Sequence, residues 1–180
     1  DGTLLDFCGG LEDIRQGRLQ TIGDPHDRFR EDPVRMLRAI RFEAKLGLIL
    51  DQDSQEALTQ NKAMIQEVAP ARLFDEIIKV LLTPYAASAL NKLISTGLFA
   101  ELFPATAEEL DSHPRTLKLL QAAMENTESR LAEDKRVAPF FLYAILLWPA
   151  VRRQFSHLNQ SSATPLEAMA HAGRLMKYGA

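Results

Sequence analysis

Asp32 and Arg35 are the two side chains of this 180-residue sequence whose types and spacing best fit recognition of a nucleotide base. They stand three residues apart at the expected start of a helix, and side chains at that spacing lie next to each other. A carboxylate only accepts hydrogen bonds, whereas a guanidinium only donates them. Adenine and cytosine each present an amine donor beside a ring-nitrogen acceptor, so the pair complements A or C. Guanine and uracil have the opposite polarity, and a buried mismatch of that kind is strongly rejected.

A simpler interpretation of Asp32 needs no ligand. Asp32 precedes Pro33, and an aspartate before a proline is typical of a helix start. The carboxylate then accepts a hydrogen bond from a free backbone amide and is favoured by the helix dipole. The sequence leaves both interpretations open. Glu31 is expected to support the helix start rather than to contact a base.

The helix expected from Pro33 to Leu46 has an apolar side and a cationic side. A wheel at 100° per residue places these apolar side chains toward the core: Met36, Leu37, Ile40 and Ala44. The other side carries a row of cations: Arg35, Arg38, Arg41 and Lys45. An arginine presents a planar fork of donors that suits phosphate oxygens, so the row predicts phosphate contacts. The alternative is an ordinary solvent-exposed helix face.

The composition describes one soluble folded domain, or a lobe of a larger protein. With 46% hydrophobic and 25% charged residues and a net charge of −3, the chain is neither disordered nor a non-specific DNA-coating protein. Residues 28–45 nevertheless hold six basic and three acidic residues, so their local charge is positive. The single Cys8 suits a reducing, cytoplasmic compartment. No apolar run is long enough to span a membrane, and the histidines lack ligand spacing, so neither a membrane partner nor a metal site is predicted.

The expected fold is mainly α, a multi-helix lobe with a short two-strand β remnant at the N-terminus. Strands are expected at residues 3–7 and 18–22, and this remnant must dock on the helices or on a further sheet because an isolated hairpin is marginal in water. Helices are expected over 33–46, 54–68, 71–82, 84–97, 114–132, 137–155 with a kink at Pro149, and 164–177. The first ten residues resemble the end of a folded segment rather than the beginning of a protein, so we expect the chain to be a fragment of a longer protein.

Three segments occur in an order that is typical of one protein family. Residues 6–14 resemble a D-x-x-G-G-x-x-D-I/L linker, and residues 28–42 resemble a neck helix with an E-D-x-x-R motif at Glu31, Asp32 and Arg35. Residues 70–76 resemble the helical motif that follows. Together they resemble the class II nucleotidyltransferases, the family of bacterial poly(A) polymerases and CCA-adding enzymes.

The resemblance implies an enzyme that adds AMP from ATP to RNA 3′ ends without a template. In that family a head domain holds Mg²⁺ through a D-x-D pair that precedes the linker, and the present sequence contains neither that part of the family pattern nor the R-R-D motif. The implied partners are ATP, an RNA 3′ end and the missing catalytic head. The chain itself is expected to hold neither a catalytic residue nor a metal, and to be inactive alone.

The motif positions also imply roles for individual residues. Asp32 and Arg35 are implied to recognise the incoming base, and Arg38, one turn further on, to contact the triphosphate. Arg41 and Lys45 are implied to meet RNA backbone or solvent.

Arg72 and Glu76 have two possible roles. Four residues apart, they either form a helix-surface ion pair or brace the neck beside the nucleotide pocket. Ala71 before Arg72, together with residues 126–148, favours the poly(A) polymerase branch. A CCA-adding enzyme and a non-catalytic helical RNA-binding or adaptor lobe remain the alternatives.

The expected domain organisation has three parts. Residues 1–24 are the end of a nucleotidyltransferase head, 25–97 are neck helices for base recognition and RNA binding, and 98–180 are a helical body.

Overall fold

The computed structural model describes residues 5–161, with side chains described up to Ser156. The chain is mainly α, as predicted, with one small parallel sheet in the described part. The first half comprises α1 (Gly10–Gln16), β1 (Arg18–Leu19), α2 (Pro25–Glu31), α3 (Val34–Leu46), β2 (Ile49–Leu50), α4 (Gln52–Asn61) and the 3₁₀ helix η1 (Lys62–Glu67). The second half comprises α5 (Pro70–Leu81), α6 (Ala86–Ser95), α7 (Leu98–Leu102), α8 (Pro104–Ser112), α9 (Pro114–Ala132) and α10 (Pro139–Ser161).

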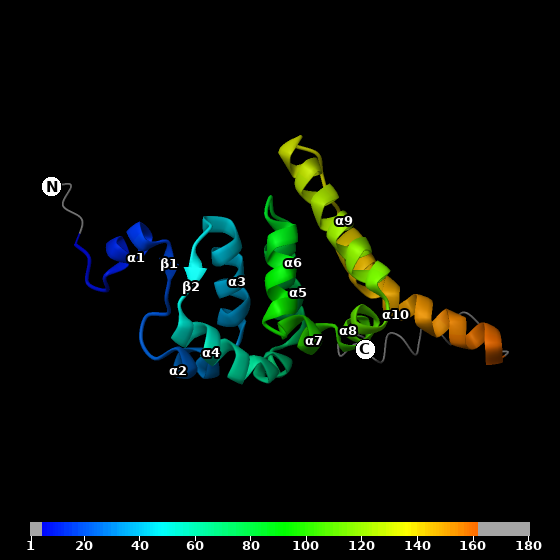
Figure 1. Ribbon diagram of the computed structural model, residues 1–180, viewed down its shortest axis with the longest axis horizontal. Coiled ribbons are helices and arrows are strands. Elements are labelled where there is room, and N and C mark those ends of the chain that lie inside the picture. Colours follow the sequence, from blue (N-terminus) through cyan, green and yellow to red (C-terminus); the bar gives the residue numbers. More distant parts are fainter. Residues whose placement is uncertain (1–4, 162–180) are drawn as a thin grey trace.

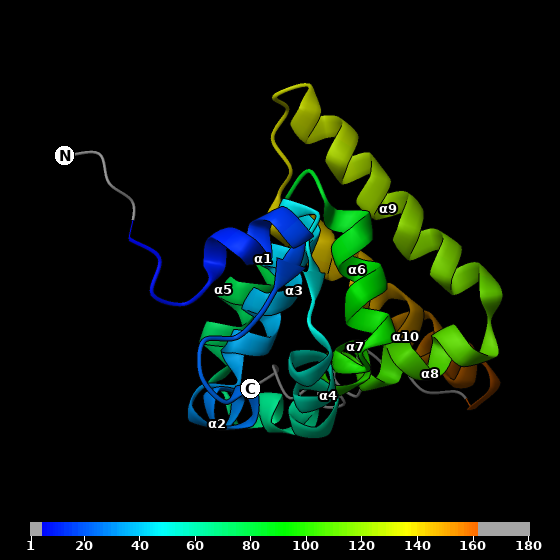
Figure 2. The same ribbon diagram turned by 60° about the vertical axis from the view of Figure 1, so that its left-hand side comes forward.

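The helices follow one another along the long axis of the molecule (Figure 1). The elements α1 to α4 occupy one end, α5 to α7 the middle, and α8 to α10 the other end. Figure 2 shows α9 as a long oblique helix beside α6, and these two helices pack against each other. The helix α3 packs against both α5 and α6, so one side of the predicted base-reading helix is covered by the bundle.

The boundaries of α3 follow its sequence signals. The helix ends at Gly47, whose φ of 64° is a left-handed conformation that glycine adopts without a Cβ penalty. Met36, Leu37 and Ile40 are fully buried, as their spacing predicts. Complete burial of such a side chain stabilises a fold by about 1.5–3 kcal/mol. The cationic row therefore lies on a helix whose opposite side is held by buried side chains.

The β remnant differs from its prediction. The second expected strand is confirmed only over Arg18–Leu19, and it pairs in parallel with Ile49–Leu50, which was not predicted to be a strand. Residues 5–7 are not a strand, and the rest of the expected first strand lies outside the described residues. A hydrogen bond of 2.8 Å from the Ile49 amide to the Gly17 carbonyl continues the pairing. The remnant is thus docked on the helical lobe through the segment after α3, one of the two expected outcomes.

Several helix boundaries are corrected by the structure. The helix expected to start at Ser54 begins at Gln52, because the carboxylate of Asp51 accepts a hydrogen bond from the Ser54 amide and caps it. Its second part, Lys62–Glu67, is a 3₁₀ helix. The helices α1, α2, α7 and α8 were not among the predicted ranges, whereas α9 has the predicted bounds. The helix predicted over 164–177 lies outside the described residues.

The helix α10 is fixed against α8 by one buried hydrogen bond. It runs through Pro149, where the missing N–H removes one bond from the helix ladder. The buried hydroxyl of Thr106 donates to the carbonyl of Leu146 at 2.7 Å. This contact sets where the second half of α10 lies relative to α8.

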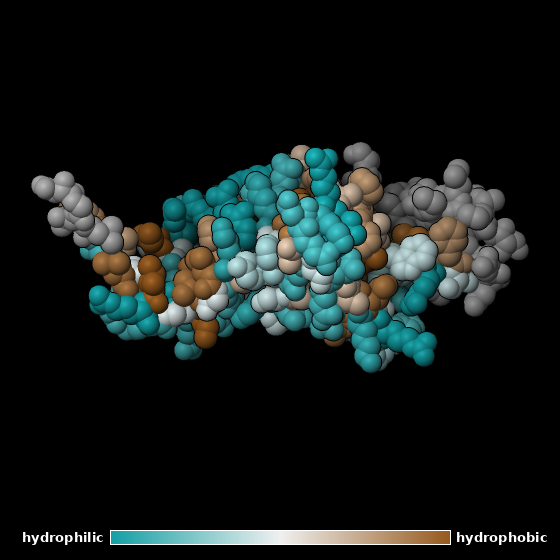
Figure 3. All heavy atoms as spheres, turned by 90° about the horizontal axis from the view of Figure 1, so that it is seen from above, coloured by the Kyte–Doolittle hydropathy of each residue, from teal (hydrophilic) through white to brown (hydrophobic). Residues whose placement is uncertain are grey.

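Apolar side chains are exposed at the N-terminal end. Leu5, Phe7, Ile14 and Ile22 are each more than 60% exposed. Figure 3 shows hydrophobic surface gathered over this end of the molecule. No described helix has both the length and the hydropathy needed to cross a membrane.

Candidate nucleotide and RNA site

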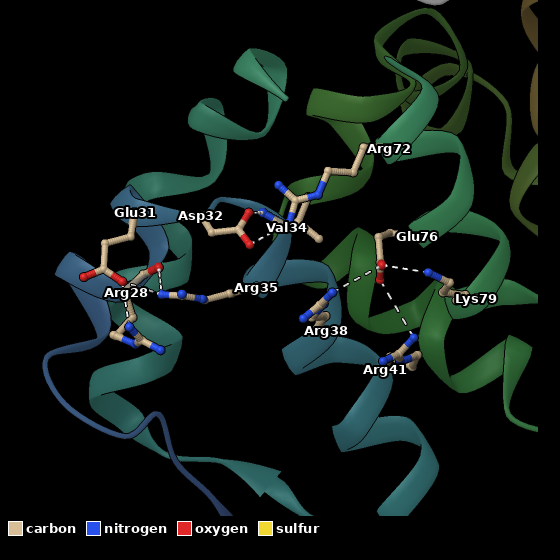
Figure 4. A network of polar contacts seen from close by, with 10 residues as sticks. All are labelled: Arg28, Glu31, Asp32, Val34, Arg35, Arg38, Arg41, Arg72, Glu76 and Lys79. Atoms are coloured by element: carbon tan, nitrogen blue, oxygen red, sulfur yellow. Dashed lines mark hydrogen bonds and ion pairs between the residues drawn. The ribbon is translucent and has the colours of Figure 1, made fainter. Parts of the chain in front are cut away.

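Asp32 lies in the short connection between α2 and α3, and both oxygens of its carboxylate are used. The amide of Val34 donates to Oδ1 at 3.3 Å, so the carboxylate does accept from the start of α3, but the N-cap position is Pro33 rather than the predicted Asp32. The guanidinium of Arg72, on α5, donates to Oδ2 at 2.7 Å (Figure 4). Burial raises the pKa of the Asp32 carboxyl, but the hydrogen bond and charge of Arg72 outweigh burial and leave that pKa below its usual value. Asp32 is therefore held as a carboxylate and in one orientation.

Arg35 is held by the end of α2 rather than by Asp32. Its Nη1 donates to Oε2 of Glu31 at 2.7 Å and to the carbonyl of Arg28 at 3.0 Å. Glu31 also accepts a hydrogen bond from Arg28 at 2.6 Å. The hydrogen bond from Arg35 is the main reason that the pKa of Glu31 lies below its ordinary value. Glu31 supports the helix start, as expected, and does so by orienting Arg35.

The Asp32 carboxylate and the Arg35 guanidinium point in different directions. In Figure 4 the carboxylate faces Arg72 and Val34, and the guanidinium faces Glu31 and Arg28. A carboxylate has about four lone-pair positions and a guanidinium five N–H donors. Two hydrogen bonds occupy two of the lone-pair positions of Asp32. Arg35 donates both of its hydrogen bonds through Nη1, so they leave its other nitrogens unused. Acceptor positions on Asp32 and donors on Arg35 thus remain unused among the described residues.

Glu76, on α5, is the buried centre of a second charge cluster. Its side chain is 5% exposed and lies 3.0 Å from Lys79 Nζ, 3.6 Å from an Arg38 nitrogen and 3.8 Å from an Arg41 nitrogen. Burial raises the pKa of Glu76, but the Lys79 hydrogen bond and the three positive charges lower it below its ordinary value. Glu76 is the anion that balances the middle of the cationic row.

The two contacts from α3 to Glu76 are too long for hydrogen bonds. Among the described residues, Glu76 Oε2 accepts no hydrogen bond and Arg38 donates none. Glu76 therefore draws Arg38 and Arg41 to one side of α3 by charge while leaving the Arg38 donors unused. The alternative of an Arg72–Glu76 ion pair is wrong, because Arg72 pairs with Asp32. This geometry favours the bracing role for both residues.

The last cation of the row lies apart from both clusters. Lys45, in the last turn of α3, is exposed and has no ion-pair partner among the described residues.

Phe42 is 40% exposed, and the Arg41 guanidinium carbon lies 5.2 Å from its ring centre. This is a cation–π distance.

A pocket of about 200 Å³ opens beside the row, between α3 and the segment around β1. Its lining includes Arg35, Arg38, Phe42 and Phe29, together with Thr21 of the connection after β1. Its volume is below the roughly 300–1,000 Å³ of drug-sized ligand sites, so it has room for a ring but not for a whole nucleoside triphosphate.

Two further features were not among the predicted site residues. One is an apolar pocket of about 410 Å³ between η1, α5 and α7, lined by residues such as Ile65, Leu73 and Leu102. The other is a group of cations between α8 and α10. Both bring together segments that are far apart in the sequence, so no local pattern indicates them.

The described residues contain no group of three or more His, Cys, Asp or Glu side chains arranged to hold a metal ion. Asp6, a carboxylate near the N-terminal end, accepts hydrogen bonds from the amides of Cys8, Gly10 and Leu11. The Leu11 bond is the largest of the effects that lower the Asp6 pKa. Both oxygens of Asp6 therefore accept from the backbone around the start of α1, and this arrangement does not fit a Mg²⁺ site.

Comparison with known proteins identifies relatives over nearly the whole chain. Residues 47–110 match a family model described as a probable RNA and SrmB-binding site of polymerase A. The chain is 37% identical over 178 residues to poly(A) polymerase I of Haemophilus influenzae, covering 96% of this chain and 39% of the relative. It is 34% identical over 175 residues to the CCA-adding enzyme of Bacillus subtilis, covering 94% of this chain and 44% of the relative.

The fold has solved counterparts. The CCA-adding enzyme of Bacillus stearothermophilus in complex with CTP matches with a TM-score of 0.56 at 25% identity, over 95% of this chain and 53% of that one. The present chain therefore spans about two fifths of the length of its poly(A) polymerase relative and about half of that solved chain. Over the length that it shares with these relatives, the chain belongs to the family of poly(A) polymerases and CCA-adding enzymes.

Proposed function

We propose that this chain is the neck and body of an enzyme that adds AMP from ATP to RNA 3′ ends. The observation that carries the proposal is the arrangement at the start of α3, where Asp32 and Arg35 are separately oriented by Arg72 and Glu31. A side chain fixed by its own partners is preorganised, which base recognition requires. The similarity to poly(A) polymerase I supports the same assignment.

In this proposal Asp32 accepts a hydrogen bond from the exocyclic amine of adenine, and Arg35 donates to the adjacent ring nitrogen. Arg72 positions Asp32, and Glu31 positions Arg35. Guanine would face Asp32 with an acceptor and Arg35 with a donor, so discrimination follows from unmatched polar groups.

Arg38 has the free donors for a triphosphate oxygen, and Glu76 draws it toward the same side as Arg41. Arg41 and Lys45 are proposed to contact RNA backbone at the other end of α3. The Mg²⁺ used in the reaction is proposed to be held by a catalytic head of the same protein, because the carboxylates described here do not fit it. No step of the transfer is assigned to residues of this chain, and we expect the chain alone to be inactive.

The proposed division of the chain is that residues 1–24 end the head, 25–97 form the neck and 98–180 form the body. A cytoplasmic location is proposed from the single cysteine and from the similarity to poly(A) polymerase I.

CCA addition is the second candidate, favoured by the similarity to CCA-adding enzymes in both sequence and fold. Asp32 and Arg35 would read cytosine with the same polarity as adenine, so these two residues do not separate the candidates. The residue before Arg72 is alanine, which favours the polymerase branch.

One assay distinguishes these functions. The full-length protein is given either tRNA lacking its 3′ end or a generic single-stranded RNA, with ATP or CTP alone and with both. Long adenylate tails on the generic RNA are the expected result. Addition limited to tRNA and requiring CTP would assign the CCA activity. Transfer to neither RNA would contradict both and leave an RNA-binding or adaptor lobe.

A further inference from the structure

A second cationic region lies at the opposite end of the molecule from Asp32. Two adjoining hollows of about 420 and 320 Å³ share His113 and Arg152 in their linings. Arg115 and Arg153 complete the set, and we call these four residues the basic corner. His113 precedes α9, Arg115 lies in its first turn, and the other two lie on α10. Figure 1 places the start of α9 beside α8 and α10, and each of these three helices contacts the other two.

The nearby carboxylates neutralise only part of the basic corner. Glu108 lies 2.6 Å from a nitrogen of Arg153, and the buried Glu109 lies 3.6 Å from Arg153 and 3.2 Å from His113. Arg115 and Arg152 have no ion-pair partner among the described residues, and both are exposed. Two arginine charges therefore face the hollows without an internal counter-charge.

The start of α9 adds to this positive potential. The free amides of a helix N-terminus carry partial positive charge, which is normally balanced by acidic residues in the first turn. The first turn of α9 contains no acidic residue and contains Arg115 instead. A cation in this position is unfavourable by itself, so this end of the chain has an unbalanced field that an anion would relieve.

The neighbouring side chains indicate which anion fits. The hydroxyls of Ser112 and Ser156 line the larger hollow but donate to the backbone carbonyls of Glu108 and Arg152, so the arginines are its donors for an anion. Trp148 lies one turn before Arg152 on α10, and its side chain is 52% exposed. An exposed aromatic ring one helical turn from an arginine suits a base that stacks while the next phosphate is bound.

We propose that the basic corner binds a phosphate group of single-stranded RNA, with Trp148 stacking on an adjacent base. This inference rests on the proposed function, since it places a second binding point for the same RNA away from its 3′ end. The family model covers residues 47–110 and so stops before every residue of the basic corner.

The test is binding of a labelled oligoadenylate to the full-length protein at several salt concentrations. Arg115→Gln and Arg152→Gln are each expected to weaken binding roughly three- to tenfold at low salt. For a single strand, the slope of log affinity against log salt should become shallower by about 0.7 for each phosphate that the variant no longer binds. Trp148→Ala should weaken binding roughly fivefold or more, and Trp148→Phe should restore most of it. Melting temperatures and ATP affinity are measured for each variant to separate RNA binding from folding.

The matched control is Arg136→Gln, which removes an exposed arginine in the connection after α9, a helix about 28 Å long whose other end lies at the basic corner. It should change neither the affinity nor the salt slope. Equal affinity and equal salt slope in the Arg115→Gln, Arg152→Gln double variant would overturn the inference. If the unaltered protein bound no oligoadenylate at any salt concentration, the proposed function itself would fail.

Two competitors identify the ligand class. Inorganic phosphate at millimolar concentration should weaken oligoadenylate binding to the unaltered protein more than to the double variant. If phosphate binding depends on Arg115 and Arg152 but RNA binding does not, the basic corner holds small anions only and the RNA assignment is wrong. Competition by polyglutamate as strong as by RNA of equal length would also contradict that assignment.

Discussion

The two cationic regions of this molecule differ in what balances their arginines. Beside α3, Arg35 and Arg72 donate hydrogen bonds to Glu31 and Asp32, and the buried Glu76 draws two further arginines toward itself. In the basic corner, Arg115 and Arg152 lack such partners within the described residues. Balanced charges fix side chains in place and leave little net field, whereas unbalanced charges create a field without fixing geometry. The first arrangement suits selection among similar ligands, and the second suits capture of any phosphate.

The largest expected effect comes from removing the buried anion beside α3. Glu76→Gln keeps the shape but leaves Arg38, Arg41 and Lys79 without a counter-charge. We expect the free energy of unfolding to fall by about 2–3 kcal/mol, less than for a fully buried pair because two of these cations are substantially exposed. Urea denaturation measures this change.

The matched control is Glu12→Gln, which removes the exposed partner of Arg15. Its effect should stay below about 0.5 kcal/mol. Equal effects of the two substitutions would mean that the Glu76 cluster is an ordinary set of surface charges.

The second prediction concerns the partner of Asp32. Arg72→Gln removes the charge and the 2.7 Å hydrogen bond that lower the pKa of Asp32. The pKa of the Asp32 carboxyl should rise, and kcat/KM for ATP should fall roughly tenfold, equivalent to about 1.4 kcal/mol. NMR titration of the carboxyl and steady-state kinetics check the two parts. An unchanged pKa would contradict the assigned pairing.

A third, smaller effect separates the two regions. Thr106→Val removes the buried hydroxyl that donates to the Leu146 carbonyl and should cost about 1 kcal/mol of unfolding free energy. Because α10 carries Arg152, RNA affinity should fall while ATP affinity stays constant. A parallel loss of ATP affinity would show that the two regions are not independent.

Acidification should have the smallest effect on stability of the changes considered, when that effect is counted for each carboxylate separately. The pKa values of Asp6, Glu31, Asp32 and Glu76 are all lowered in the folded chain. The unfolded chain therefore binds protons first, so the stability from these groups is complete above their ordinary pKa values of 3.8 and 4.5. It is lost as the pH falls through the lowered values. Unfolding midpoints from pH 6 to pH 2 measure this decline, and the decline should be shallower in Glu76→Gln.

The sequence predicts the parts of the fold that depend on local signals. The face of α3, its end at Gly47 and the bounds of α9 follow from side-chain periodicity, glycine and proline. The pairing of β1 with β2 was missed because each strand has two residues and the partners are 31 positions apart in register, Arg18 with Ile49. The Asp51 cap was missed because Ser54 is an equally acceptable capping residue by type.

The candidate site was predicted residue by residue, but its pairings were not. Helical spacing placed Asp32 beside Arg35, whereas a distant partner on α5 and a nearby one at the end of α2 turn the two side chains apart. The i,i+4 spacing likewise suggested an ion pair between Arg72 and Glu76. Because α3 packs against α5, however, Glu76 pairs with Arg38 on α3, and Arg72 pairs with Asp32 just before α3. The basic corner has no local pattern, since its residues belong to two segments that lie more than 35 positions apart, His113 and Arg115 at the start of α9 and Arg152 and Arg153 on α10.

The most direct test of the central claim is the selectivity of the full-length enzyme for ATP over GTP in Asp32→Asn. Asparagine also caps helices and can accept from Arg72, so this change can keep both hydrogen bonds of Asp32 while removing its charge and making it a donor as well as an acceptor. We predict that the ratio of kcat/KM for ATP to that for GTP falls at least about tenfold, with an unchanged melting temperature. A lower rate with the ATP to GTP ratio unaltered would contradict base recognition by Asp32 and leave it only its role at the start of α3.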